Sequence, residues 1–520
     1  MIFLQQPRGV QLSLAQIVLV VAPGFILYGY NQSSIGGLLS LPSWTETFPE
    51  IDTTHTQGAT KSQNATLQGL VVATFVMGAL VGCMACMYLG DILGRRKCIF
   101  IAAMLTLIGE VICMSSVGLG QLVFGRVTIG CAIGIISSTI PVWQAECSPP
   151  AHRGKHVVLD GVFTCLGFAL ASWVNLGSSQ ANVSNPSITW RLPLAVPIIF
   201  SALLMPGIYV MPESPRWLIK VGRFEQASEV LSLLKDLPVN DPIIINEVAD
   251  MRKALESDTT KKATLRDMFT METDKLFYRF CLCILLQFYQ QMSGSNLISV
   301  YAPVIFEQNL KLSSRKARLF AGGTLTWKFL SSFVAFFTID RFGRKALFMF
   351  SGLGMGVCML ILAITTGYSS ENAVASYVSV IVIFLYNFFV PIGFLGANFL
   401  YCAEVAPVSL RVGMSAISTA NHWLWNFVVV MSTPVAIASI GHWYFILYAT
   451  IGLSIPLVVW LWFPETMGQT LEEIDQVFRL NEGFRNIVNA SVKGSRDNKK
   501  TPDIKMAIKE KDNILRQDLP

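Results

Sequence analysis

Apolar stretches of about 20 residues recur along this chain, and they restrict its possible folds more than any other feature. Such a stretch is long enough to cross about 30 Å of hydrocarbon as a helix. We expect twelve of them, centred near residues 25, 79, 106, 132, 166, 201, 291, 329, 357, 388, 425 and 453. Only 14% of the residues are charged, well below the roughly 25% of soluble proteins. The sequence therefore predicts an all-α protein that spans the lipid bilayer many times.

Basic residues indicate on which side of the membrane each loop lies. They cluster in short loops between alternate apolar stretches, as in "GRRK" at 94–97, "HRGK" at 152–155 and "RFGRK" at 341–345. This pattern is typical of cytoplasmic loops, so an even number of spans places both termini in the cytoplasm, with the plasma membrane as the expected location. The basic stretch at 311–319 falls on the outer side and does not fit. Because these loops account for most of the basic residues, the net charge of +6 gives no reason to expect a nucleic acid partner.

The chain contains three motifs twice, in the same order. "GDILGRR" at 90–96 returns as "IDRFGRK" at 339–345, "ECSPPAHR" at 146–153 as "EVAPVSLR" at 404–411, and "PESPRW" at 212–217 as "PETMGQ" at 464–469. A common spacing of about 250 residues predicts a duplicated six-helix unit whose halves rock about a central site. The predicted parts are a cytoplasmic N-terminus (1–13), a first six-helix bundle (14–210), a cytoplasmic helical linker (211–276), a second six-helix bundle (277–463) and a cytoplasmic tail (464–520).

At these motifs the sequence resembles the sugar porter family of the major facilitator superfamily, from Gly29 to Glu473. Five stretches in the family's order carry the resemblance: "GDILGRR", "RVTIGCAIG…PVWQAECSPPAHRG", "PESPRWLIKVGR", "FYQQMSGSN…Y" and "FPETMGQTLEEID". The resemblance implies twelve transmembrane helices in two six-helix repeats, and transport of hexose-type sugars by alternating access without a cofactor. The sequence shows no metal-binding pattern and no catalytic constellation. We therefore predict a transporter and not an enzyme.

Charged side chains of the repeated motifs form the first set of candidate functional residues. In the family, such groups bond across the two halves and latch the cytoplasmic side shut when the central site faces outward. The resemblance assigns this role to Asp91, Arg95, Arg96, Arg126, Glu146, Arg153, Asp340, Arg344, Glu404 and Arg411. The alternative is that these groups only anchor helix ends. We favour the latch, because topology alone requires no acidic partners and because remaking such pairs lets two halves rock between two states.

A substrate with many hydroxyl groups needs neutral hydrogen-bond partners and an aromatic face inside the membrane. The seventh span supplies Gln290, Gln291 and Asn296, which converge if the helix bends at the intervening glycine. The family carries its sugar on this motif, and Trp423 and Asn426 match pocket positions of its eleventh span. The alternative for the amides is hydrogen bonding between helices, worth only about 1 kcal/mol each. We favour contact with a sugar or polyol, because three amides on one short stretch exceed that need.

Several pocket positions depart from the family's pattern. The usual fifth-span glutamine is replaced by Gly161, which follows Asp160. The usual eighth-span asparagine is replaced by Lys328, and a tenth-span tryptophan by Phe399. A lysine inside a span costs about 2.5–3.5 kcal/mol on insertion, so it needs a wet cavity or a partner. Lys328 could pair with Asp160, contact the substrate or pair elsewhere, and contact with the substrate adds a quinate-like polyol acid to the possible cargoes.

The first span, which contains "ILYGYNQSSIGGLLS" at 26–40, bears on the energy source of transport. Proton-coupled relatives have an aspartate at the position of Asn31, facing an arginine that corresponds to Arg126. Because an amide cannot titrate, we expect Asn31 to form hydrogen bonds in the central cavity and transport to be a uniport. The alternatives are a symport in which Asp160 titrates, a sensor that binds sugar without moving it, and efflux of a polar metabolite. Glu110 in the third span is interpreted as a contact between helices.

Two further features lie outside the membrane. Glycosylation sequons fall in predicted outer loops at Asn64 and Asn182. The final charged stretch, which begins with "KGSRDNKK" at 493, is predicted to be disordered.

Overall fold

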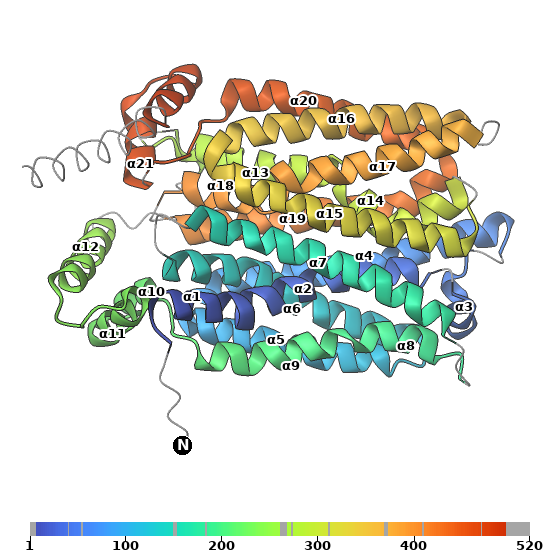
Figure 1. Cartoon of the computed structure of the whole chain (residues 1–520), viewed down its shortest axis with the longest axis horizontal. Helices are drawn as coiled ribbons and strands as arrows, with labels where there is room; N and C mark the ends of the chain where they lie inside the picture. The colour runs from blue at the N-terminus through green and yellow to red at the C-terminus, as the bar shows by residue number, and fades with distance from the viewer. Residues whose placement is uncertain are drawn as a thin grey trace, which may run out of the picture.

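The structure is a computed structural model that describes residues 7–39, 41–53, 56–148, 153–181, 185–259, 268–271, 274–309, 312–368, 373–407, 410–469 and 471–495. Within these residues the chain is almost entirely helical and contains no β-strand. The long helices run side by side along one axis (Figure 1). Shorter helices lie beyond one end of this bundle (Figure 1), among them α10 (Pro215–Lys220), α11 (Phe224–Lys235), α12 (Pro242–Thr259) and α21 (Leu471–Leu480).

All twelve expected spans are present as helices. The first six are α1 with α2 (Gly9–Gln16 and Ala22–Ser33), α4 (Gly58–Leu93), α5 (Arg95–Met114), α6 (Leu119–Cys147), α7 (Arg153–Gln180) and α8 with α9 (Ile188–Ala195 and Pro197–Val210). The second six are α13 with α14 (Leu276–Met292 and Ser295–Val304), α15 (Ser314–Phe342), α16 (Arg344–Tyr368), α17 with α18 (Ala373–Phe394 and Ala397–Val405), α19 (Arg411–Ser439) and α20 (Trp443–Trp462). In the described residues, ten of these spans are long and apolar enough to cross a membrane by length and composition alone.

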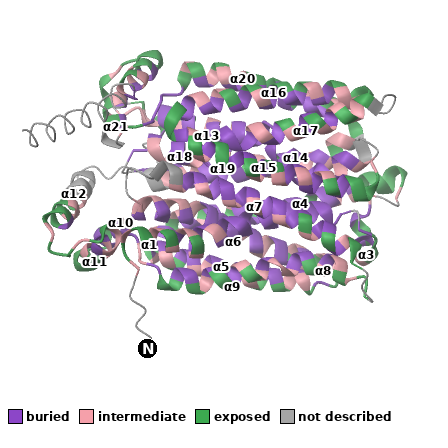
Figure 2. Ribbon diagram, viewed as in Figure 1, coloured by how far each residue is buried: buried purple, intermediate pink, exposed green. Residues whose placement is uncertain are grey.

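The distribution of buried and exposed side chains suits a lipid solvent. Large apolar side chains such as Phe337, which is 72% exposed, lie on the outside of the bundle. Polar side chains such as Gln287, Asn398 and Lys328 are fully buried. Figure 2 shows the buried residues gathered where helices contact one another. Exposed apolar surface is favourable in hydrocarbon, whereas a buried polar group requires a partner.

The two six-helix bundles contact each other on both sides of the membrane centre. Helix α4 packs on α19, and α7 packs on α15. Near the outer end, a Cβ atom added to Gly36 would lie 2.1 Å from the carbonyl oxygen of Val300. Near the other end, a Cβ atom added to Gly161 would lie 1.7 Å from the carbonyl oxygen of Leu395. Only glycine permits such close approaches of two backbones.

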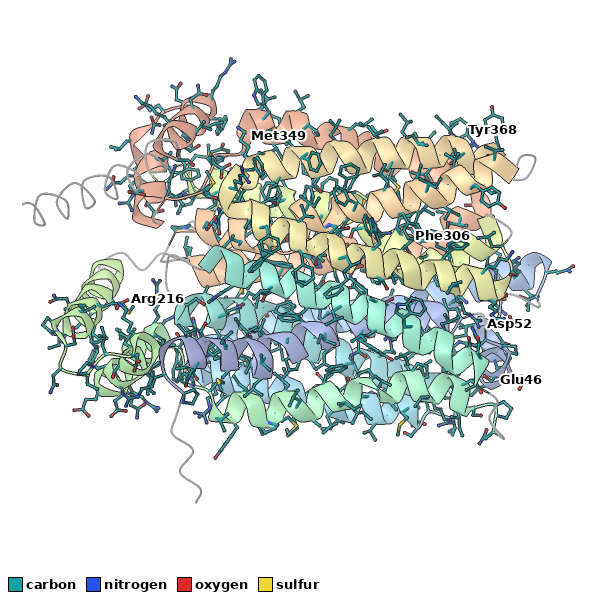
Figure 3. All side chains as sticks on the ribbon, viewed as in Figure 1. Glu46, Asp52, Arg216, Phe306, Met349 and Tyr368 are labelled. Atoms are coloured by element: carbon teal, nitrogen blue, oxygen red, sulfur yellow. The ribbon has the colours of Figure 1, made fainter. Side chains whose placement is uncertain are left out.

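The short helices mark the end of the bundle that the charge pattern assigns to the cytoplasm. Figure 3 shows Arg216 of α10 at this end, with Glu46 and Asp52 at the opposite end. Helix α3 (Pro42–Thr47) also lies at that opposite end (Figure 1). The five-part division of the chain stays a prediction.

Candidate functional site

A break in the seventh span brings two candidate amides together. Helix α13 ends at Met292 and α14 begins at Ser295. Gly294 lies between them with φ 93°, a conformation that glycine adopts without strain. Across this break the Asn296 amide donates a hydrogen bond of 2.6 Å to the side-chain oxygen of Gln291. The bend expected from the sequence is therefore present.

A second break, in the tenth span, positions a partner for Gln290, the third candidate amide of the seventh span. Gly396 separates α17 from α18, and Asn398 lies one residue inside α18. The Asn398 amide donates to Oε1 of Gln290 over 2.5 Å and to Oε1 of Gln287 over 3.0 Å. With His422 of α19 these residues form one group, which we name the polar cluster: Gln287, Gln290, Gln291, Asn296, Asn398 and His422.

His422 joins the polar cluster to the first half of the chain. Its Nδ1 lies 2.8 Å from Oε1 of Gln290. Its Nε2 lies 2.9 Å from the Gln291 amide nitrogen and 3.1 Å from the Tyr28 hydroxyl. Because a carbonyl oxygen can only accept, these partners assign the proton to Nδ1 and leave Nε2 as the acceptor of a neutral imidazole. Tyr28 belongs to α2, so this contact bridges the two bundles.

Aromatic rings lie beside the polar cluster. The ring centroid of Trp423 is 5.3 Å from that of Tyr28, and its indole nitrogen donates to the Ser137 hydroxyl over 3.4 Å. The ring of Phe399 is 5.5 Å from that of His422. Asn426 lies one turn after His422 and is fully buried, yet neither polar atom of its side chain has a hydrogen-bond partner within the described residues. An unsatisfied buried amide costs about 1–3 kcal/mol, so this amide is suited to bind a polar ligand.

Asn31 contacts both Glu110 and Arg126. Its side-chain amide donates to Glu110 over 3.3 Å, and Ser201 donates to the other carboxyl oxygen of Glu110 over 2.9 Å. The guanidinium of Arg126 donates to the backbone oxygen of Asn31 over 3.1 Å and lies over the Phe75 ring. Arg126 therefore contacts Asn31, as expected, but it binds the backbone of Asn31 and not the Asn31 side chain. Glu110 links α2, α5 and α9, which agrees with its interpretation as a contact between helices.

Lys328 and Asp160 are both buried, but the structure does not pair them. The Lys328 ammonium donates to the Ser299 hydroxyl over 2.7 Å and lies 4.8 Å from the centre of the Phe168 ring. Neither carboxyl oxygen of Asp160 has a partner in the part of the chain that the structure describes. The lysine extends toward α14, where Ser299 follows Asn296 by one helical turn. Of the three roles considered, pairing with Asp160 is the one that this geometry does not support.

The charged motifs of the first half form a network at the end of α5. Arg95 contacts Glu146 at 3.2 Å and Asp91 at 3.4 Å. Glu213, from "PESPRW", accepts hydrogen bonds from the backbone N–H groups of Arg95 and Arg96 over 3.1 and 3.2 Å, so it caps the N-terminus of α5. Burial raises the pKa of the Glu213 carboxyl, and these hydrogen bonds act against the rise.

The second half repeats this network at the end of α16. Arg344 contacts Glu404 at 3.1 Å and Asp340 at 3.3 Å. Glu465, from "PETMGQ", accepts hydrogen bonds from the backbone N–H groups of Arg344 and Lys345 over 3.0 and 3.1 Å. The duplication seen in the sequence is therefore also a duplication of contacts.

These ion pairs differ from the expected latch in one respect. They were expected to cross between the halves, but each pair that the structure describes in these networks lies within one half. The physical reason is reach: each arginine has an acid one turn before it and a glutamate at the end of a neighbouring helix of the same bundle. The side chains of Arg153 and Arg411 lie outside the described residues. The latch role itself stays a prediction.

Sequence reasoning did not select five residues that complete these sites. Gln287 precedes the quoted stretch "FYQQMSGSN", and Asn398 and His422 precede the selected residues Phe399 and Trp423, but their partners come from distant helices. Glu213 and Glu465 were visible as repeated acids of "PES" and "PET". The signal that could have identified both is the Gly-Arg helix start in each repeat, which leaves N–H groups in need of an acceptor.

The two sequons remain predictions of glycosylation. The side-chain nitrogen of Asn64 donates to the backbone oxygen of Asp52 over 2.8 Å. Asn182 lies outside the described residues. Of the final charged stretch, residues 493–495 are helical, so the predicted disorder is wrong for these three residues, and the stretch from 496 onward lies outside the described residues.

Two six-helix bundles that meet around a central polar cluster define a transporter of the major facilitator class. Solved structures share this fold. A structure of the proton:xylose symporter XylE bound to 6-bromo-6-deoxy-D-glucose matches with a TM-score of 0.78 at 23% identity, covering 90% of this chain and 100% of that chain. An inward-open structure of XylE from E. coli matches with a TM-score of 0.69 at 24% identity, covering 88% of this chain and 98% of that chain. The prediction of twelve helices in two repeats is confirmed.

Sequence comparison identifies the family. The family described as "Sugar (and other) transporter" matches residues 17–478. Sugar transporter STL1 of Saccharomyces cerevisiae is 32% identical over 467 residues, which cover 89% of this chain and 80% of the relative. High-affinity fructose transporter ght6 of Schizosaccharomyces pombe is 28% identical over 478 residues, which cover 90% of this chain and 88% of the relative. The chain belongs to the sugar transporter family of the major facilitator superfamily, and it is a multi-pass membrane transporter and not an enzyme.

Proposed function

We propose that this protein moves a monosaccharide or a related polyol across the plasma membrane by alternating access, with both termini in the cytoplasm. The polar cluster carries the proposal, because its neutral amides and neutral imidazole offer donors and acceptors to hydroxyl groups. The names of the relatives, which refer to sugar, fructose and xylose, support the same class of cargo. The proposed substrate contacts are Gln290, Gln291, Asn296, Asn31, Phe399, Trp423 and Asn426.

We propose that transport is a uniport. Asn31 cannot titrate, and the Arg126 guanidinium is held by a neutral backbone oxygen and not by a carboxylate. The second candidate is a proton symport through Asp160, favoured by one observation: its carboxyl group is buried without a hydrogen-bond partner in the described residues. Protonation is one way to relieve that cost.

Uptake of labelled hexose by a host that lacks hexose transporters tests both modes. For a uniport, the sugar is expected to equilibrate without accumulating, and a protonophore is expected to leave the initial rate unchanged. Accumulation that collapses on adding the protonophore, and that Asp160→Asn abolishes, would transfer the proton role to Asp160. A flux no greater than that of the empty host would contradict transport and favour a sensor, whereas faster export than import would favour efflux.

Lys328 supports a second class of cargo, a polyol that carries a carboxylate. The ammonium is fully buried, and among the described residues it contacts a hydroxyl and an aromatic ring. The hydroxyl belongs to Ser299, which follows Asn296 by one helical turn of α14. A buried cation with neutral neighbours is suited to an anionic group of a substrate.

Competition by a quinate-like acid tests this role of Lys328. The acid is expected to inhibit labelled hexose uptake, and Lys328→Gln is expected to weaken that inhibition about tenfold or more, because a charge-assisted contact worth about 1.5–3 kcal/mol is lost. Hexose uptake itself should persist. Ser299→Ala, which removes the hydroxyl neighbour but keeps the charge, is the matched control. Unchanged inhibition in Lys328→Gln would show that the lysine is structural.

We further propose that the two charged networks serve the latch by keeping the cytoplasmic ends of α5 and α16 rigid as the halves rock. The repeated caps Glu213 and Glu465 support this proposal, because each ties a helix start to the end of the sixth or twelfth span.

A further inference from the structure

Two cavities lie at equivalent places in the two halves, at the end of the bundle that carries the charged networks. The first, of about 560 Å³, lies between the ends of α5 and α9 and the short helices α10 and α11. The second, of about 620 Å³, lies between the ends of α15, α16 and α20 and the helical segment 484–495. Arg96 lines the first and Lys345 the second, and each follows the Gly-Arg pair of its repeat. The duplication of the chain has therefore produced two copies of one site.

Exposed basic side chains line both cavities. Lys97 and Arg223 in the first, and Arg485 in the second, are exposed. No ion pair or hydrogen bond of these three side chains is present among the described residues. Glu213 and Glu465 also line the cavities, but their carboxylates accept the backbone N–H groups that begin α5 and α16. The acids are thus occupied by the starts of α5 and α16, and the basic residues that line each cavity outnumber its one acid, so the net charge of each lining is positive.

The same cavities open beside aromatic side chains on the outer surface of the bundle. Tyr209 of the first cavity is 67% exposed, and Phe342 and Trp460 of the second are 58% and 54% exposed. Exposed aromatic rings next to basic residues at the ends of spans are typical of the level of lipid head groups. The Arg96 guanidinium donates to the backbone oxygen of Tyr209 and lies over its ring, which fixes a cation at that level.

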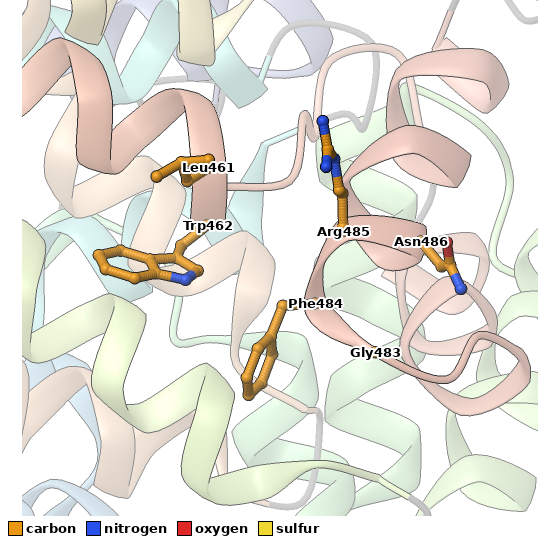
Figure 4. Close-up of a pocket in the computed structure, with 6 residues that line it drawn as sticks. All are labelled: Leu461, Trp462, Gly483, Phe484, Arg485 and Asn486. Atoms are coloured by element: carbon orange, nitrogen blue, oxygen red, sulfur yellow. The ribbon is translucent and has the colours of Figure 1, made fainter.

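A third cavity, of about 350 Å³, extends the second one along the membrane-facing surface. The two share Leu461 and Arg485. Figure 4 shows Phe484 and Arg485 of the segment 484–495 across from Leu461 and Trp462 of α20. Arg485 therefore lies between the second cavity at the helix ends and an apolar surface that continues toward the hydrocarbon.

We propose that each of the two equivalent cavities binds the head group of an anionic phospholipid of the cytoplasmic leaflet. The phosphate and the acidic head group pair with the basic side chains, and the acyl chains run along the exposed apolar faces of α5 with α9 and of α16 with α20. A small soluble anion would use the cations but not the aromatic and apolar walls, so a lipid fits the whole site. The proposal rests on the cytoplasmic orientation argued above, but not on which substrate is carried.

Native mass spectrometry of the purified, delipidated full-length protein tests the proposal. The probes are phosphatidylserine, phosphatidylcholine with the same acyl chains, and glycerophosphoserine, which has the head group without the chains. Two phosphatidylserine molecules are expected to bind more tightly than either other probe. Arg485→Gln is expected to lower the affinity of one of the two sites for phosphatidylserine about fivefold. The double variant Lys97→Gln with Arg223→Gln is expected to lower the affinity of the other site by about fivefold for each charge removed.

Lys493→Gln is the matched control, because Lys493 is exposed on the same segment as Arg485 but does not line the cavity. It is expected to leave phosphatidylserine binding unchanged. Equal binding of phosphatidylcholine, or equal weakening by Lys493→Gln, would overturn the proposal. Binding of glycerophosphoserine as tight as that of the lipid would also overturn it, in favour of a site for a soluble anion. None of these readouts depends on transport, so a failed proposal here is distinguishable from a failure of the proposed function.

Discussion

Replacing Gly161 with valine is expected to lower net hexose transport about ten- to hundredfold while substrate binding remains measurable. The first atom of any side chain at this position would lie 1.7 Å from the carbonyl oxygen of Leu395. That oxygen belongs to the backbone of the tenth span, next to the break at Gly396, so it cannot move aside as a flexible side chain would. Overpacking a well-packed contact costs about 1–3 kcal/mol or more, which reduces the population of the closed state by the expected factor.

The position makes this substitution a test of alternating access. Gly161 lies in the first bundle and Leu395 in the second, toward the end with the charged networks. Valine should therefore hold that side open and leave the halves free to close only at the outer side. Hydrogen–deuterium exchange is expected to quicken in the adjoining parts of α7 and α18. Gly36→Val, whose Cβ would lie 2.1 Å from the Val300 carbonyl oxygen, should produce the reciprocal change at the outer side.

Gly177→Val is the control on the same helix, because a Cβ atom there would meet nothing within 4 Å. It should transport at the wild-type rate at equal abundance in the membrane. Wild-type transport by Gly161→Val would show that closure at this contact is not a step of the cycle. Gly161 also stands where relatives have a sugar-binding glutamine, and the close approach of Leu395 explains why this chain has no side chain there.

The sequence predicted what depends on local chemistry. The twelve spans follow from runs of apolar residues, and the bend that joins Gln291 to Asn296 follows from the glycine between them. The partner of each buried polar group depends on packing between distant helices, which one sequence does not reveal. Lys328 therefore reaches Ser299 and not Asp160.

The charged networks show the same division between local and distant information. The repeated acids and arginines were evident as pairs, and their equivalence in the two halves is present in the contacts. Whether an arginine turns toward its own bundle or across the interface depends on the arrangement of the helix ends. In this structure Arg95 and Arg344 each contact two acids of their own bundle, so these two guanidinium groups bond within their own halves.

His422→Ala is expected to lower hexose uptake about tenfold or more. The imidazole is the partner of Gln290, Gln291 and Tyr28 at once, and its loss leaves buried polar groups unsatisfied at about 1–3 kcal/mol each. His422→Asn, which keeps one donor and one acceptor, should lose less. Initial rates of labelled hexose uptake, normalised to the amount of protein in the membrane, measure the effect.

A double-mutant cycle with Gln291→Ala separates a shared site from two independent defects. If His422 and Gln291 hold the substrate as one hydrogen-bonded unit, the double variant should be little worse than either single variant, because the second substitution removes a contact already lost. Additive losses would mean that the two residues act separately. His442→Ala, a histidine at the outer end outside the polar cluster, is the matched control and should keep the wild-type rate. Wild-type uptake by His422→Ala would remove the polar cluster from the transport path, because a substrate that passes between the bundles at this level must displace or use the bond between Tyr28 and His422.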